Sequence, residues 1–218
     1  MEGNSLILLR PLISLWLKMD GRSKEELMGR LAEEVRRCTR CELYKGRRNV
    51  VVGEGSLDAD VMLVGEAPGY WEDVKGRPFV GAAGKLLDEL LADIGLSRGE
   101  IYIANVLKCR PPKNRDPRPE EVEACTPYLD RQIRIISPRV IVSLGRHSTR
   151  YLLGKAGLEF GQMRTAHGQV YQLEILDLKL LLMPTYHPAA ALYNPKYRQI
   201  IEEDLQVLKE LLRREAIL

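Results

Sequence analysis

The chain has 218 residues, slightly more than one domain usually holds and fewer than two need. Its 45% of apolar and 29% of charged residues suffice for a sizeable core, and they exclude a disordered, collagen-like or low-complexity chain. A net charge of +3 does not by itself argue for nucleic acid, and four cysteines are too few for a secreted disulfide framework. We therefore expect a protein of the reducing cytoplasm.

The chain begins with an apolar stretch, residues 6–17, which Arg10 and Pro11 interrupt. It is shorter than the roughly 20 residues that span a bilayer, and it lacks the cationic start and small-residue cleavage site of a secretory signal. We expect no membrane association. Residues 1–18 are predicted to be an N-terminal extension and residues 19–218 a single domain, and a native start at Met19 is an open alternative.

Helical and strand patterns alternate along the rest of the chain. Leucine and valine at four-residue steps predict an amphipathic helix over residues 24–37. The sequence then predicts strands over 60–64, 101–104, 139–144 and 178–183, an additional hairpin strand over 170–176, and helices over 84–95, 119–136 and 196–214, with one more helix after the third strand. This alternation predicts an α/β fold with a mostly parallel, four-stranded sheet covered on both faces.

Polar residues follow three of the predicted strands at the point where each strand ends. They are Glu66, Asn105 and His187. Ligands of parallel sheets bind at the carboxyl ends of the strands, so these residues predict the site. His187 stands between two prolines, which indicates a loop that presents the imidazole, whereas His147 and His167 are interpreted as structural or exposed.

The four cysteines all lie near the ends of predicted elements. Cys38 and Cys41 form a CxxC pair, Cys109 follows the second strand, and Cys125 lies early in the next helix. This arrangement suits one four-thiolate site that holds zinc or a [4Fe–4S] cluster, and the spacing does not choose between them. Four unrelated reduced core cysteines are the alternative.

A cationic loop lies between the last two cysteines. Residues 108–118 contain three prolines and five basic residues against one acidic residue: Lys108, Arg110, Lys113, Arg115 and Arg118. Such a loop suits DNA phosphates, although a merely solvated surface gives the same pattern.

Two nucleotide-binding motifs are absent from the sequence. Residues 81–85 read Gly-Ala-Ala-Gly-Lys, but Phe79 and Leu86 stand where a Walker loop needs glycine and Ser or Thr. No GxGxxG follows a strand. ATPase and nicotinamide chemistry are therefore unsupported.

Several motifs in order resemble one known family. They are Gly65-Glu-Ala-Pro-Gly69, Gly76-Arg-Pro-Phe-Val-Gly-Ala-Ala-Gly84, Asn105 with Lys108-Cys-Arg-Pro-Pro112, and Tyr186-His-Pro-Ala-Ala190. This set is similar to the iron–sulfur uracil-DNA glycosylases of bacteria and archaea, called family 4. The resemblance implies a three-layer α/β/α fold, prefers [4Fe–4S] over zinc on the four cysteines, and implies excision of uracil from DNA.

The resemblance also implies roles for individual residues. Phe79 would stack on the flipped uracil, Asn105 would select its hydrogen-bonding edge, and His187 with the Glu66–Ala67 backbone would stabilise the uracil anion. Pro68 belongs to the same loop. Glu66 and Glu72 are candidates for orienting water or stabilising the sugar cation, and Leu192 for a wedge in the base stack. Ala67 and Gly69 stand where better-known uracil glycosylases have aspartate and tyrosine, so water activation and exclusion of thymine must differ here.

Other functions and partners stay open at this stage. The chain lacks the basic, histidine-bearing insertion of a relative that traps uracil-DNA covalently, so hydrolytic turnover is preferred over a non-turnover uracil-DNA-binding protein. An iron–sulfur electron-transfer or adaptor protein and a zinc-stapled binding module are further alternatives. We expect a monomer that acts on single- or double-stranded uracil-containing DNA, with a sliding clamp as a candidate partner. Only five Asn and six Gln suggest a thermophile.

Overall fold

The computed structural model describes residues 22–218. The predicted extension over residues 1–18 and the alternative start at Met19 lie outside the described residues. The helices, strands and contacts are those of this described part of the chain.

A six-stranded sheet forms the centre of the molecule, in the order β1-β3-β2-β4-β6-β5. The strands are β1 (Glu54–Gly55), β2 (Val61–Gly65), β3 (Tyr102–Asn105), β4 (Val140–Leu144), β5 (Tyr171–Ile175) and β6 (Leu178–Thr185). The four central strands are parallel, as predicted, and β5 forms the predicted antiparallel hairpin with β6. The predicted count of four strands omitted the antiparallel edge strand β1, because two residues carry no alternating pattern.

Helices connect and cover the strands. They are α2 (Lys24–Arg36), α3 (Tyr70–Lys75), α4 (Ala82–Asp93), α5 (Pro119–Ile136), α6 (Arg146–Lys155), α7 (Met163–Ala166), α8 (Pro188–Tyr193) and α9 (Pro195–Arg214), with short 3₁₀ turns η1 (Glu42–Lys45) and η2 (Pro112–Asn114). The long helices match the predictions closely. The three short helices α3, α7 and α8 were not predicted, since four to six residues are too few for a helical period.

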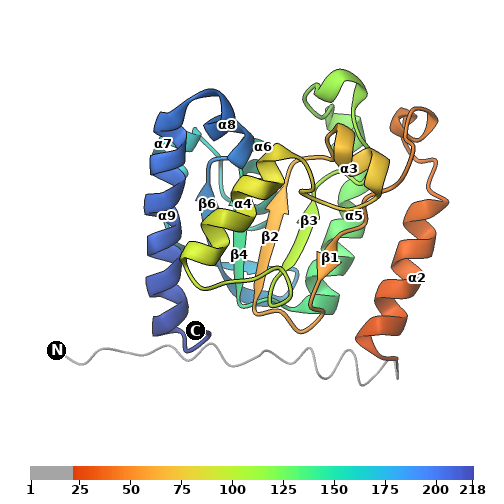
Figure 1. The fold of residues 1–218 in the computed structure, drawn as a ribbon. Coiled ribbons are helices and arrows are strands. Elements are labelled where there is room, and N and C mark those ends of the chain that lie inside the picture. Colours follow the sequence, from red (N-terminus) through yellow and green to blue (C-terminus); the bar gives the residue numbers. More distant parts are fainter. Residues whose placement is uncertain (1–21) are drawn as a thin grey trace.

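Helices cover both faces of the sheet, so the molecule has three layers. Met62 and Val64 of β2 join one core with α2, α5 and α6, whereas Val61 and Leu63 join a second core with α4 and α9. Figure 1 shows α4 in front of the sheet, α9 along its left side and α5 behind it. Successive strand residues point to opposite faces, so a sheet covered on both sides requires the continuous apolar runs that this sequence contains.

The helix α2 begins with a capping box. The Ser23 hydroxyl accepts a hydrogen bond from the Glu26 amide at 3.2 Å, and the Ser23 amide donates to the Glu26 carboxylate at 2.9 Å. Leu27, Leu31 and Val35 then form the buried stripe of the helix. Cys38 and Cys41 come shortly after the end of this helix, so its packing positions them.

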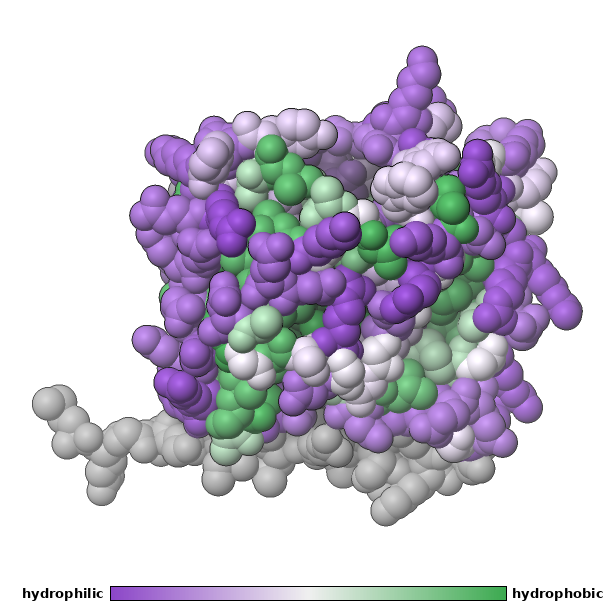
Figure 2. Space-filling view, in the orientation of Figure 1, coloured by the Kyte–Doolittle hydropathy of each residue, from purple (hydrophilic) through white to green (hydrophobic). Residues whose placement is uncertain are grey.

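Hydrophilic side chains cover most of the face drawn in Figure 2, and hydrophobic ones reach it in separate patches. Among residues 22–218, every helix is too short or too polar to cross a membrane.

Candidate active site and cysteine centre

One pocket of about 540 Å³ lies at the carboxyl ends of the parallel strands. All the residues predicted to be catalytic or to contact uracil line this pocket, and so does Leu192. The predicted residues are Glu66, Ala67, Pro68, Glu72, Phe79, Asn105 and His187. The chain passes from β2 to β3 on one side and later to β4 on the other side of β2. The pocket therefore lies at the edge where the order of strands reverses, which is the usual ligand site of such sheets.

Phe79 forms an aromatic wall of the pocket from a strained backbone. Its φ is 51°, a left-handed value that is uncommon for a bulky residue. A Cβ at Gly84 would lie 1.8 Å from the Phe79 carbonyl oxygen, so only glycine fits there. The ring stacks on the His187 imidazole, with centroids 5.4 Å apart and planes 26° apart.

Arg98 holds the backbone that carries Phe79. Its guanidinium donates to the carbonyl oxygens of Phe79 and of Pro78, the latter at 3.1 Å. It also pairs with Glu54 of β1 at 2.8 Å and with Asp88 of α4 at 2.5 Å. The aromatic wall is thus tied to an edge strand and to a helix.

Asn105 ends β3 inside the pocket with an unsatisfied acceptor. The residue is 2% exposed, and its Oδ1 has no hydrogen-bond partner within the described chain. A Cβ at Gly65 would lie 2.3 Å from this oxygen, so Gly65 is what allows it to reach the pocket. Because a buried acceptor without a partner costs about 1–3 kcal/mol, it indicates a ligand that brings an N–H or O–H group.

His187 is the N-cap of α8 and presents a neutral imidazole. Its Nδ1 accepts a hydrogen bond from the Ala189 amide at 3.1 Å, which leaves the proton of the neutral ring on Nε2. Burial lowers the pKa of His187 to about 4, against a weaker opposing effect of Glu72. At neutral pH the side chain is therefore an uncharged donor.

Glu72 holds the loop between Phe79 and α4. One carboxylate oxygen, Oε1, accepts hydrogen bonds from the backbone amides of Val80 and Gly81, each at 2.9 Å. Its side chain therefore supports the stretch of chain that presents the aromatic wall.

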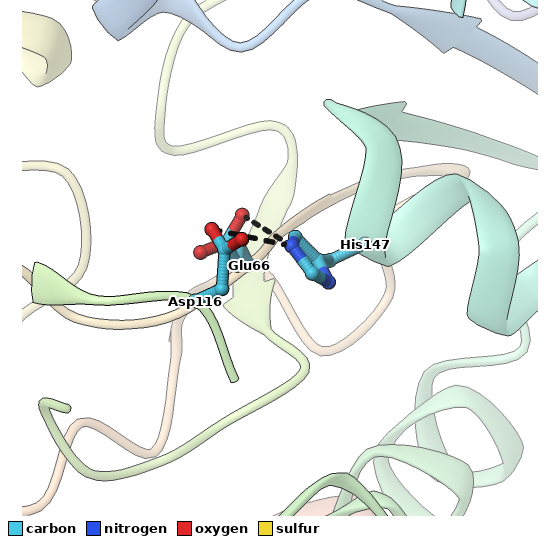
Figure 3. Close-up of side chains that lie close together, drawn as sticks. All are labelled: Glu66, Asp116 and His147. Carbon is cyan, nitrogen blue, oxygen red and sulfur yellow. Dashed lines mark ion pairs between the residues drawn. The ribbon is translucent and has the colours of Figure 1, made fainter. Parts of the chain in front are cut away.

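Glu66, which lines the pocket, lies close to two residues that do not line it, Asp116 and His147 (Figure 3). The Nε2 atom of His147 lies 3.8 Å from a Glu66 oxygen and 3.5 Å from an Asp116 oxygen. Arg146 donates to His147 Nε2 at 3.1 Å and also pairs with Asp116. Burial, with added repulsion from Asp116, raises the pKa of Glu66 to about 7. Neither Asp116 nor His147 was predicted as a site residue.

The cationic loop of residues 108–118 differs from the prediction in one residue. Lys108 is 1% exposed, and its Nζ donates to the Asn105 carbonyl at 2.8 Å and to Gln132 Oε1 at 2.5 Å. The prediction that Lys108 contacts DNA is therefore wrong, because its ammonium faces the protein interior, where it supports the strand end that carries Asn105.

The other four cations of this loop lie partly or fully at the surface. Arg115 pairs with the buried Glu121, and Arg110 donates to Asn114 Oδ1 at 2.7 Å. Lys113 and Arg118 are exposed.

The four cysteines line one small cavity. Two of the sulfur atoms accept hydrogen bonds. The Lys108 amide donates to Cys125 Sγ at 3.2 Å, and Arg47 Nη1 donates to Cys109 Sγ at 3.4 Å. All four are free of disulfides. Burial raises the pKa of the Cys125 thiol to about 12, so its sulfur becomes a thiolate when a bound cation compensates the charge.

The spacing of these sulfur atoms bears on what they hold. Within residues 22–218, the one group of three metal-ligand side chains whose ligand atoms all lie within 4.8 Å of one another is Glu66, Asp116 and His147. No three cysteine sulfurs in that range come as close. A single tetrahedral zinc, with Zn–S bonds of about 2.3 Å, would hold its sulfurs about 3.8 Å apart. The cysteine sulfurs are therefore not arranged as in a preformed tetrahedral zinc site.

Comparison with known proteins agrees with this geometry. The family model described as the uracil DNA glycosylase superfamily matches residues 52–209. A type-4 uracil-DNA glycosylase of Saccharolobus solfataricus is 51% identical over 86% of this chain and 87% of its own length. Type-4 enzymes of Archaeoglobus fulgidus and Thermotoga maritima are 49% and 44% identical, over 85% and 89% of this chain and 94% and 99% of theirs. The chain therefore belongs to the uracil DNA glycosylase superfamily and, within it, to the type-4 uracil-DNA glycosylases.

Proposed function

We propose that this protein flips uracil out of DNA and hydrolyses its N-glycosidic bond, which leaves an abasic site for base excision repair. The observation that carries the proposal is the unpartnered Oδ1 of Asn105, buried in a pocket beside the Phe79 ring and the His187 donor. A flipped base needs an aromatic face and a matching hydrogen-bonding edge, and these three residues supply both.

Asn105 accounts for the choice of uracil. Its free Oδ1 can accept the N3–H of uracil, and its side-chain amide can donate to O4. Cytosine presents an acceptor at N3 and a donor at N4, so both contacts would be reversed. A site that leaves buried polar groups unpaired with the wrong base discriminates strongly.

The reaction separates charge across the bond between N1 of uracil and C1′ of the sugar. The bonding electron pair leaves with uracil, and the His187 Nε2–H donates to the anion that forms, a contact worth about 3 kcal/mol in comparable sites. Water then adds to the cationic C1′, and its proton passes to Glu66, whose raised pKa suits a base near neutral pH. Glu72 supports the Phe79 loop through its two amide contacts.

DNA is held around the pocket by the accessible cations of the 108–118 loop. Arg110, Lys113 and Arg118 are the candidates for phosphate contacts, and Arg115 has a second role because it pairs with Glu121. Leu192, 47% exposed at the pocket rim, stays our candidate for the wedge. Salt should weaken binding in proportion to the number of phosphates contacted.

We propose that Cys38, Cys41, Cys109 and Cys125 hold a [4Fe–4S] cluster rather than zinc. Two observations support this assignment: no three of these sulfurs all lie within 4.8 Å of one another, and N–H groups are directed at two of them. When bound, the group would join the chain after α2 to the start of the 108–118 loop at Cys109 and to helix α5 at Cys125, and so stabilise the segment that contacts DNA.

The proposal also covers the cellular location, the domain organisation and the assembly state of the protein. DNA and reduced thiols coexist in the cytoplasm, which is where we propose the enzyme works. The single sheet shared by all six strands supports treating residues 22–218, the described part of the proposed domain, as one unit. A monomeric state and a sliding-clamp partner stay predictions.

The decisive experiment measures release of free uracil. Anaerobically purified protein is incubated with oligonucleotides that contain uracil, cytosine or thymine at one position, and the visible spectrum is recorded on the same sample. Uracil-specific release by a brown protein would support both proposals, and Asn105→Ala should abolish most of it. Binding without release would instead favour a non-turnover uracil-DNA-binding or electron-transfer protein, and a colourless active protein would favour zinc.

A further inference from the structure

Large apolar side chains gather at the mouth of the uracil pocket. Tyr70 and Trp71 of α3 are 42% and 54% exposed, and Leu192 and Tyr193 of α8 are 47% and 90% exposed. All four line the same pocket. In Figure 1, α3 and α8 lie on opposite sides of the upper edge of the molecule, above the carboxyl ends of the strands. The pocket thus has an aromatic rim on two sides.

On the α3 side, the rings of the rim pack against each other and lie near a held loop. The Tyr70 and Trp71 rings meet edge to face, with centroids 5.1 Å apart. A Cβ at Gly81 would lie 3.6 Å from Trp71 Cδ1, so the indole also lies close to the loop that Glu72 holds. An aromatic ring that is fixed before binding loses little conformational entropy when a ligand stacks on it.

Positive charge accompanies the aromatic rings. The guanidinium carbons of Arg48 and Arg110 lie 5.5 and 5.2 Å from the Tyr70 ring centroid. Cation–π contact of this kind keeps both arginines beside α3. An exposed aromatic ring next to guanidinium groups is the combination that binds the bases and phosphates of a single strand.

We propose that Trp71 and Tyr193 stack on the bases that neighbour the flipped uracil, one on each side of it, in single-stranded DNA. The inference rests on the proposed function, because the strand that delivers uracil to the pocket must cross this rim. Arg48 and Arg110 contact the phosphates beside Trp71. In a duplex each neighbouring base stays paired with the opposite strand and stacked on its outer face, whereas the bases of a single strand can turn toward the rim, so the rim favours a single strand over an intact duplex.

Tryptophan fluorescence tests the stacking without any excision. The chain has two tryptophans, at 16 and 71, so Trp16→Phe makes Trp71 the sole one. A uracil-free oligothymidylate should quench its emission with a saturable curve, and a duplex of equal length should quench it much less. An unchanged emission, or equal quenching by strand and duplex, would overturn the proposal. A failure of uracil release would leave this measurement intact and would count against the proposed function alone.

A substrate series locates the stacked bases. Trp71→Ala and Tyr193→Ala should each raise the dissociation constant for a single-stranded uracil oligonucleotide by about 5- to 150-fold. When the bases on both sides of uracil are replaced by abasic spacers, the loss should shrink to less than about twofold. Leu158→Ala, which removes a 43% exposed side chain after α6, is the control and should change neither value. A loss that is equal with and without the neighbouring bases would show that the two residues act through the fold, and would refute the proposal.

Discussion

The pH dependence of uracil release tests the surroundings of Glu66. Its pKa is raised to about 7 by burial and, secondarily, by Asp116. If Glu66 acts as a carboxylate, the single-turnover rate should fall about tenfold for each pH unit well below 7. Burial lowers the pKa values of His187, to about 4, and of His147, so neither histidine accounts for a limb near pH 7.

The same carboxyl group predicts a change in stability. The pKa of Glu66 is about 7 in the folded protein and about 4.5 in the unfolded chain. The contribution of protonated Glu66 to the free energy of unfolding is therefore fully present below about pH 4.5 and is lost as the pH rises through about 7. The shift corresponds to about 3 kcal/mol. Glu66→Gln stays neutral at every pH. It should therefore raise the free energy of unfolding by up to about 3 kcal/mol at pH 8 and leave it nearly unchanged at pH 4.

Two measurements settle the matter. Rapid-quench assays of uracil release between pH 5 and 9 should show the acidic limb in the unsubstituted protein, its shift to lower pH in Asp116→Asn, and its absence in Glu66→Gln. Urea unfolding at pH 4 and pH 8 gives the free energies. An acidic limb that survives in Glu66→Gln, or a stability difference that does not depend on pH, would refute the reasoning.

Substitutions at three further positions, Gly84, Lys108 and Glu72, test the support of the pocket. Gly84→Ala should lower the free energy of unfolding by about 1–3 kcal/mol in urea, because the new Cβ meets a backbone carbonyl, whereas Gly154→Ala in the open part of α6 should raise it by about 0.5 kcal/mol. Lys108→Met leaves two buried acceptors unpaired and should cost about 1–3 kcal/mol in the same assay, while the exposed Lys113→Met should stay within about 0.5 kcal/mol. Glu72→Gln keeps an oxygen that can accept both amide hydrogens, so it should reduce single-turnover excision less than tenfold and Glu72→Ala considerably more; equal losses would show that the negative charge itself is required.

The strands and the residues that follow them could be predicted from the sequence for one reason. A parallel sheet covered on both faces needs continuous apolar runs, and such runs are visible without any structure. A polar residue directly after each run must then lie at the carboxyl edge. Glu66, Asn105 and His187 are brought together in the pocket in this way.

The parts that sequence reasoning missed depend on contacts between distant segments. Lys108 was counted with its charged neighbours, but Gln132 of α5 and the end of β3 bury it. In the sequence, Asp116 stood out only as the one negative charge of a basic loop, and His147 was only one of three histidines. Thirty residues separate Asp116 from its partner Arg146, and no local pattern reports such a pairing.

Arg98 connects residues whose natural variation should be linked. Glu54 is not among the residues that line the pocket, yet the same guanidinium binds it, Asp88 and the backbone under Phe79. Lysine has three hydrogens on one nitrogen and cannot reproduce these contacts in their forked geometry. A lineage that changed Glu54 alone would leave Asp88 as the carboxylate that still pairs with Arg98 and would weaken the hold of Arg98 on the aromatic wall. Positions 54 and 98 should therefore covary during evolution, although only one of them belongs to the surroundings of the flipped base.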